Sequence, residues 1–385
     1  FIVNRFCHIR VARNMGDPAA STRRRLVLHD FLSHDECKEL EFIHKSNCTV
    51  GYRPNVFSTT LSHLVATNCA HLIVPFVRIR EKIKETVEWF FQCEFELIVE
   101  FTGLISWTTG ASIGWHSDDN RPYLKQREFT AVCYLNSYGK DFKGGLFHFR
   151  DGQPASIAPM AGDLVIYTAD DLNIHSVDEI YEGERLTLTL WFSRDNAHDE
   201  DAKLISLLEG ALEFRHPMLA SPNMYWFSQN QDCQEHGFHI CYARMHAIGL
   251  DICDSEERNS ETLQVVCGNE MFELQFVNIL HLLQVVEFYK WKCNGQKGVG
   301  MAGGKAQVWE VSEMQRETIK RMKKAMVTDN ALFEKMFGSS NTERFFDWPS
   351  FSSSVSEFRD YTVRLHQSLI RCFPLWKCQA MIYCI

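Results

Sequence analysis

The run FTAVCYLNSYGKDFKGGLFHF, residues 129–149, decides the fold. It contains short segments rich in β-branched and aromatic residues, separated by Asn, Gly and Asp, which favour turns. Similar short runs occur on both sides of it, at residues 95–107, 163–168 and 186–192. Many short strands punctuated by turn signals predict a β-sandwich or a barrel.

Two amphipathic helices are expected before this block of strands. The first begins at Ser33, which has capping-box spacing with Glu36. The second spans residues 72–92, where apolar side chains recur at helical spacing and Pro75 lies near the start. Helices followed by strands predict an α+β fold in which the helices pack on a rolled sheet.

The character of the chain changes after residue 195. A polar break precedes a stretch in which helical patterns dominate. These helices are expected at about 204–212, 271–291, 309–327 and 355–372. We therefore expect a flexible segment at 1–25, a domain at 26–195 and a mainly α-helical region at 196–385.

The composition of the 385 residues is that of a globular protein with a sizeable core, 45% hydrophobic and 23% charged. A net charge of −9 argues against a nucleic-acid binder that relies on bulk electrostatics. No uninterrupted apolar run reaches the roughly 18 residues of a membrane span. The 14 cysteines include no CxxC pair, so disulfides are not implied.

The sequence GWHSDDN, residues 114–120, contains the first two candidate metal ligands, His116 and Asp118. On an extended segment, residues i and i+2 point to the same side, so both side chains can reach one ion. His175 is the best third ligand, since it follows a strand that we expect in the same sheet. Two histidines and one carboxylate leave coordination positions open, as non-haem Fe(II) requires. A structural zinc site would have four protein ligands.

Arg185 is a candidate anion-binding residue. It lies ten residues after His175 in an alternating strand, and Thr187 shares its face. The guanidinium group can bind a carboxylate through two hydrogen bonds, and a dicarboxylate co-substrate would supply one. Each of these residues alone has an ordinary structural explanation. Their order, spacing and strand context together favour a metal and co-substrate site.

On these residues the chain resembles the Fe(II)- and 2-oxoglutarate-dependent oxygenases. The runs at 129–149 and 158–195 are similar to the catalytic domain of prolyl 3-hydroxylases (leprecan type) and its plant relatives. The likeness rests on the HxD pair, the YLN at 134–136, the pair Gly144–Gly145, the distal histidine and the arginine after it. It implies a double-stranded β-helix (jelly-roll) core.

The resemblance also implies a set of site residues and a reaction. Fe(II) would be held by His116, Asp118 and His175, and 2-oxoglutarate by Arg185, Thr187 and Tyr134. Such enzymes use O₂ to hydroxylate a C–H bond, release succinate and CO₂, and commonly require L-ascorbate. A prolyl residue of a protein or peptide is the implied substrate. The alternative substrates are a lysyl residue, a histone or a small molecule. The alternative role is a non-enzymatic adaptor with a vestigial oxygenase core.

Three predictions are weaker. Asp119, Asn120, Arg121 and Tyr123 follow the HxD pair and either line the substrate entrance or form a solvated loop. The cluster Cys233, His236, His239, Cys241 and His246 matches no common zinc finger, so we interpret it as coincidence.

The first residues lack the apolar core of a signal peptide, and the last five, MIYCI, are not an ER-retention signal. The ER, cytoplasm and nucleus therefore remain possible compartments.

Overall fold

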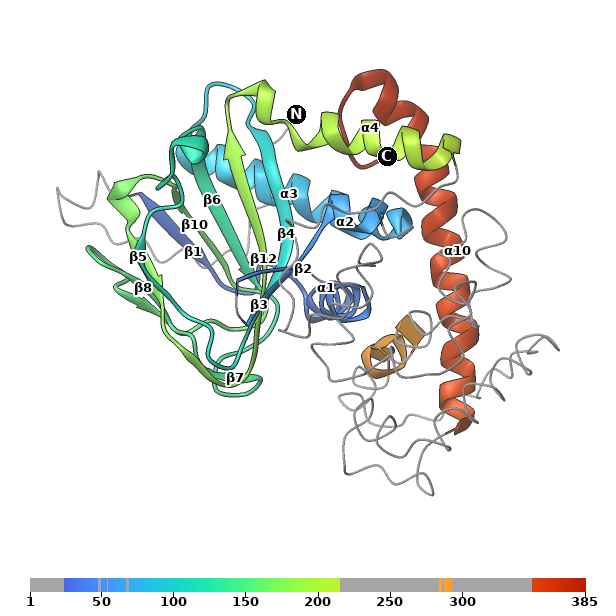
Figure 1. Cartoon of the computed structure of the whole chain (residues 1–385), viewed down its shortest axis with the longest axis horizontal. Helices are drawn as coiled ribbons and strands as arrows, with labels where there is room; N and C mark the ends of the chain where they lie inside the picture. The colour runs from blue at the N-terminus through green and yellow to red at the C-terminus, as the bar shows by residue number, and fades with distance from the viewer. Residues whose placement is uncertain are drawn as a thin grey trace, which may run out of the picture.

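The computed structural model describes residues 24–47, 50–53, 55–66, 69–214, 284–285, 287–292 and 348–385. Two antiparallel β-sheets face each other in the left half of Figure 1. The large sheet has the order β1 (Arg25–Leu28), β10 (Leu164–Thr168), β6 (Arg127–Tyr134), β12 (Ile180–Ser193), β4 (Ile98–Thr108), β3 (Val56–Thr60) and β2 (Val50–Arg53), with β7 (Phe142–Gly144) paired to β12. The small sheet has the order β5 (Ile113–His116), β11 (His175–Val177), β8 (Phe147–Phe149) and β9 (Ser156–Ile157).

This arrangement is a jelly roll and confirms the predicted double-stranded β-helix. The predicted strands at 95–107, 129–135, 163–168 and 186–192 correspond to β4, β6, β10 and β12. The sequence did not predict β1, β2 and β3, which extend the large sheet at both edges. They are only four or five residues long, too short for a clear alternation. β1 begins at Arg25, the last residue of the predicted flexible segment, and residues 1–23 lie outside the described part of the chain.

Helices cover the side of the large sheet that faces away from the small one (Figure 1). They are α1 (His34–Ser46), α2 (Leu61–Ala66), η2 (Ala70–Ile73), α3 (Val74–Phe91) and α4 (Glu200–Phe214). α10 (Trp348–Gln379) lies outside this layer, against η2, α3 and α4. The short turns η3 (Pro122–Leu124), η4 (Asp171–Asn173) and η5 (Asn196–His198) lie in loops. Ser33 caps α1, and the predicted capping box with Glu36 is complete. α3 corresponds to the helix predicted at 72–92, with Pro75 in its first turn.

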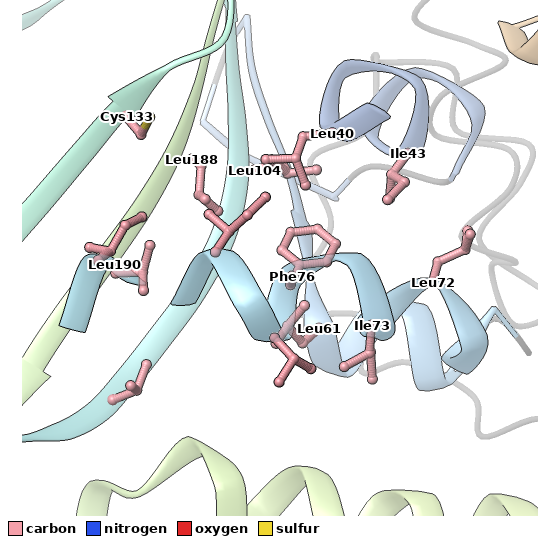
Figure 2. Packing of buried hydrophobic residues seen from close by; sticks show 14 of the residues in the cluster. Leu40, Ile43, Leu61, Leu72, Ile73, Phe76, Leu104, Cys133, Leu188 and Leu190 are labelled. Atoms are coloured by element: carbon pink, nitrogen blue, oxygen red, sulfur yellow. The ribbon is translucent and has the colours of Figure 1, made fainter. Parts of the chain in front are cut away.

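Strand β12 separates two hydrophobic clusters. Leu186, Leu188 and Leu190 point toward the helices and belong to the larger cluster. Figure 2 shows this packing, with Phe76 of α3 on the helix side and Leu188 on the strand side. The second cluster lies between the two sheets and is rich in aromatic side chains. The alternation along one strand therefore separates a core that stabilises the fold from an interior that holds the site.

The described C-terminal residues pack on the larger cluster. Phe358 and Tyr361 of α10 contact the ring of Phe42 in α1, at centroid distances of 6.4 and 5.9 Å. The Tyr361 hydroxyl donates a hydrogen bond to Glu39 at 2.8 Å. The division into three parts remains a prediction, because most of residues 196–385 are outside the described ranges. The predicted helix at 309–327 and the Cys233–His246 cluster lie there as well.

A buried ionic cluster joins α3, α4, β4 and the C-terminus. The guanidinium group of Arg80 lies 2.8 Å from Asp201 and 3.3 Å from Glu200. Glu200 also accepts from the backbone N–H of Thr102, and Asp201 accepts from that of Ile382. Burial raises the pKa of Glu200 to about 7, although the nearby Arg80 charge opposes this. Glu200 is thus an acid that folding forces into a costly environment.

Among the helices that the structure describes, none has both the length and the apolar character needed to cross a bilayer.

Candidate metal centre

His116, Asp118 and His175 converge on one point between the sheets. Each offers a ligand atom, and these atoms all lie within 4.8 Å of one another. Oδ1 of Asp118 is 3.9 Å from Nε2 of His116 and 3.8 Å from Nε2 of His175. In the described part of the chain, this is the one group of three His, Cys, Asp or Glu side chains with such spacing.

The elements that bring these side chains together differ in two respects from the sequence-based expectation. His116 and His175 are direct partners on β5 and β11 of the small sheet. The preceding strand, β10, lies in the large sheet, so the expectation of a shared sheet was wrong. Asp118 lies in the turn after β5 and not on the strand. The chain crosses between the sheets before His175, a step that strand periodicity cannot reveal.

Both imidazole rings are oriented so that Nε2 is available to a metal. Nδ1 of His116 lies 2.9 Å from the Gly114 carbonyl, and Nδ1 of His175 lies 2.9 Å from the Asn173 carbonyl. A carbonyl only accepts, so Nδ1 carries the proton in each ring. The ring of Phe147 stacks on His175 at 4.9 Å. Burial lowers the pKa of His175, which favours the neutral form that binds metals.

The carboxylate of Asp118 is held on its other oxygen. Oδ2 accepts hydrogen bonds from the hydroxyls of Thr130, at 2.7 Å, and Tyr167, at 3.1 Å. Burial alone would raise the pKa of Asp118, but His175 and the Thr130 hydrogen bond bring it below its usual value. One carboxylate with two imidazole nitrogens is a donor set that fits Fe(II) and leaves coordination positions open.

Arg185 lies on the interior face of β12 and is 3% exposed. Its Nη2 donates to the Tyr134 hydroxyl at 3.1 Å, and its Nε has no hydrogen-bond partner among the described residues. No described carboxylate forms an ion pair with it, and a buried charge without a counter-ion is costly. A bound carboxylate would satisfy this guanidinium group, so the site fits 2-oxoglutarate.

Gly145, predicted from the Gly144–Gly145 pair, makes room for this arginine. Its φ is +64°, and a Cβ there would lie 2.1 Å from Ile180 Cδ1 and 3.2 Å from Arg185 Cδ. Tyr134 and Thr187 are cross-strand partners on β6 and β12, both buried. The Thr187 hydroxyl donates to the Ile105 carbonyl at 3.3 Å. The residues predicted to bind the co-substrate therefore share one wall of the interior.

The predicted substrate residues lie on an exposed loop after Asp118. Asn120 and Arg121 are exposed, and Tyr123 is 71% exposed. Asp119 anchors the loop, because it accepts from Ser117 and Lys125, both at 2.7 Å. The loop is therefore next to the candidate ligands and open to solvent. Its contact with a substrate remains a prediction.

Sequence reasoning missed a second group of interior residues. Trp191 follows Arg185 on the same face of β12 and is the cross-strand partner of Thr130. The guanidinium group of Arg127 lies 3.7 Å from the Trp191 ring, and Phe101 packs against that ring at 4.7 Å. Arg127 also pairs with Glu100 at 2.9 Å. Nε1 of Trp191 and Oε2 of Glu100 are buried and have no hydrogen-bond partner among the described residues.

Comparison with known proteins agrees with this geometry. Residues 102–193 match the model of the 2OG-Fe(II) oxygenase superfamily. This range contains the three candidate ligands, Arg185 and Trp191. The chain therefore carries an oxygenase domain of this superfamily, similar to those of prolyl hydroxylases.

Three relatives illustrate the likeness. Prolyl 3-hydroxylase 1 of Gallus gallus is 26% identical over 230 residues, covering 48% of this chain and 31% of that protein. The 2-oxoglutarate and iron-dependent oxygenase domain-containing protein 3 of Homo sapiens is 31% identical over 85 residues, 22% of this chain and 27% of that protein. The solved prolyl-4-hydroxylase of Pseudomonas putida is 18% identical, with a TM-score of 0.36, and the match covers 46% of this chain and 96% of that one. The chain spans about a third of the length of the curated relatives.

Proposed function

We propose that the oxygenase domain is an active Fe(II)- and 2-oxoglutarate-dependent dioxygenase that hydroxylates a prolyl residue of a protein or peptide. The observation that carries this proposal is the convergence of His116, Asp118 and His175 beside a buried arginine that lacks a counter-ion. A structural metal site would need a fourth protein ligand and no buried cation. An open site with an adjacent cation fits a metal that binds an anionic co-substrate.

Each of these residues has a defined task. The two imidazoles and Oδ1 of Asp118 would hold the metal. Arg185 would bind the distal carboxylate of 2-oxoglutarate, with charge-assisted hydrogen bonds in a buried setting. Tyr134 accepts from Arg185 through its oxygen, so its own proton is oriented to donate to the same carboxylate. Bound Fe(II) would supply O₂ activation, in which one oxygen atom enters succinate, CO₂ is released and the other enters the substrate C–H bond.

Apolar side chains shield His175, which is buried, from water. Phe147, Phe149 and Tyr167 form an aromatic wall around His175, with centroid distances to its ring of 4.9 to 6.3 Å. Val132 and Val165 of the same interior cluster are buried. Such apolar surroundings would strengthen the electrostatic interactions of a bound co-substrate and limit side reactions.

The prolyl substrate is favoured by the residues near the ligands as well as by the names of the relatives. The Trp191 ring lies one cross-strand step from Thr130, which itself contacts Asp118. Aromatic side chains offer apolar contacts to the pyrrolidine ring of proline, as in other proline-binding sites. The unpartnered Nε1 of Trp191 and Oε2 of Glu100 would pair with the polar backbone of a peptide.

Succinate formation from 2-oxoglutarate, measured with Fe(II), ascorbate and O₂, tests the reaction class. We expect turnover by the wild type and none above background by His116→Ala. Arg194→Ala is the matched control, since Arg194 is 58% exposed and pairs with Glu128 on the surface. Equal succinate formation by wild type and His116→Ala would reject the proposal.

Mass spectrometry of products tests the substrate. A library of proline-containing peptides, each paired with a copy in which alanine replaces proline, is incubated with the enzyme. We expect a mass gain of one oxygen atom on proline residues only. Oxygen incorporation into lysine residues or into a small molecule, with no modified proline, would replace the prolyl assignment by one of the alternatives.

A further inference from the structure

We infer that Thr130 and Tyr167 are positioning residues that hold Asp118 so that it binds the metal through one oxygen only. This inference rests on the proposed function and assigns roles to two residues that no motif marks. Thr130 on β6 and Tyr167 on β10 are direct cross-strand partners in the large sheet. Both hydroxyls reach Oδ2 of Asp118, which lies in the turn after β5. The paired strands β6 and β10 therefore hold the side chain of Asp118, which lies in a turn.

The hydrogen bonds assign different tasks to the two carboxylate oxygens. Oδ2 accepts two hydroxyl donors, at 2.7 and 3.1 Å. Oδ1 faces Nε2 of His116 and His175 and is the oxygen that would bind the ion. A carboxylate that chelates through both oxygens would occupy one further position on a metal of about six coordination sites. Binding through Oδ1 alone would leave that position for the co-substrate or O₂.

Tyr167 has a second possible acceptor, which links its position to metal binding. Its hydroxyl lies 3.1 Å from Oδ2 of Asp118 and 3.4 Å from Nε2 of His175. A phenol has one proton to donate. When an ion occupies the Nε2 lone pair, only the carboxylate remains as an acceptor. The ring itself is held by Phe147 and Phe149, at centroid distances of 5.8 and 5.4 Å.

Binding of Co(II) to the purified full chain tests this role without requiring turnover. The variants are Tyr167→Phe and Thr130→Val, which remove one hydroxyl each and keep the shape of the side chain. We expect each to raise the Co(II) dissociation constant about 10- to 100-fold, as for other hydrogen-bond partners of metal ligands. Their Co(II) d–d absorption should also change, because the carboxylate is free to chelate.

Two control variants separate positioning from packing. Thr130→Ser keeps the hydroxyl and should restore both the affinity and the spectrum of the wild type. Tyr138→Phe removes a phenol hydroxyl at the edge of the same interior cluster and should change neither. Circular dichroism confirms that each variant is folded.

The outcomes distinguish the two levels of the account. If Tyr167→Phe and Thr130→Val bind Co(II) with wild-type affinity and spectrum, the positioning role is wrong and the proposed function stands. If the folded wild type binds no Co(II), the proposed function fails first. If Thr130→Ser behaves like Thr130→Val, the effect arises from packing, and the inference is again rejected.

Discussion

The two faces of strand β12 differ in what their side chains contact: one packs on the helices and the other faces the candidate site between the sheets. Leu186, Leu188 and Leu190 face the helices, are fully buried and belong to the larger hydrophobic cluster. Arg185 and Thr187 face the interior and are also buried, yet Arg185 lacks a full set of partners within the described protein. The helix-facing side chains are fully packed without a ligand, whereas Arg185 on the interior side still lacks a counter-ion.

This difference predicts that stability and function divide between the two faces. A core that is complete loses stability when it is truncated. A buried charge without its counter-ion lowers stability and is retained where a ligand supplies the missing partner. Substitutions on the helix side should therefore lower the free energy of unfolding without altering the chemistry of the folded fraction. Substitutions in the interior should impair ligand binding and turnover with little change in the free energy of unfolding.

Asp118→Asn should have the largest functional effect. Asn keeps an oxygen that can accept from Thr130 and Tyr167 but removes the charge that a metal ion needs. We expect Co(II) affinity to fall by more than the roughly 100-fold seen when a ligand loses a hydrogen-bond partner. The free energy of unfolding of the metal-free protein should fall by only about 1 kcal/mol. Metal titration and urea unfolding measure the two quantities, and a large loss of stability with intact metal binding would contradict the comparison.

Leu188→Ala should have the largest effect on stability. Leu188 is fully buried in the helix-side cluster, so its truncation leaves a cavity. We expect a loss of about 2–5 kcal/mol in the free energy of unfolding. Succinate formation per folded molecule should be unchanged, measured at a temperature at which the variant is folded. Loss of turnover in a fully folded Leu188→Ala would show that the two faces are coupled.

Glu200→Gln should alter the pH dependence of stability. The pKa of Glu200 is raised to about 7 in the folded state, from a usual value of 4.5, mainly by burial. Between these values the folded state binds more protons than the unfolded state, so the contribution of Glu200 to stability falls as pH rises. The loss is on the order of 3 kcal/mol from pH 4.5 to pH 7. The free energy of unfolding, measured in urea at pH 5 and pH 8, should favour Glu200→Gln over the wild type more strongly at pH 8. An equal difference between variant and wild type at the two pH values would contradict the raised pKa of Glu200.

Ser33→Ala should have the smallest effect. It removes the hydroxyl that caps α1 at the backbone N–H of Glu36, 3.2 Å away. A lost N-cap costs about 1 kcal/mol. Thermal unfolding measures this change, and Ser33→Thr is the control because it can form the same cap. Succinate formation should not change, since the helix packs on the outer side of the large sheet.

Much of the fold could be predicted because local patterns determine it. The capping box at Ser33, the period of α3 and the alternation of β12 are local signals, and the structure contains all three elements. The short strands β1–β3 and the packing of α10 on α1 depend on contacts between distant parts of the chain. No periodicity within a short window encodes such contacts.

The candidate site shows the same limit. His116, Asp118 and His175 are residue types whose spacing suggests a metal, and the structure brings them together. Thr130 and Tyr167 are ordinary strand residues, and only the pairing of β6 with β10 directs their hydroxyls at Asp118. Trp191 lies six positions after Arg185 on the same face of β12, and this relation becomes informative only when the interior is seen.

Binding of 2-oxoglutarate to the Mn(II)-loaded protein, measured by titration calorimetry for wild type, Arg185→Met and Arg194→Met, tests the central claim most directly. The claim is that the buried arginine is retained for a carboxylate ligand and not for stability. We expect Arg185→Met to lose about 2–5 kcal/mol of binding free energy, or between roughly 30-fold and a few thousand-fold in affinity, while Arg194→Met binds like the wild type. Equal affinity of Arg185→Met and wild type for 2-oxoglutarate would contradict the account.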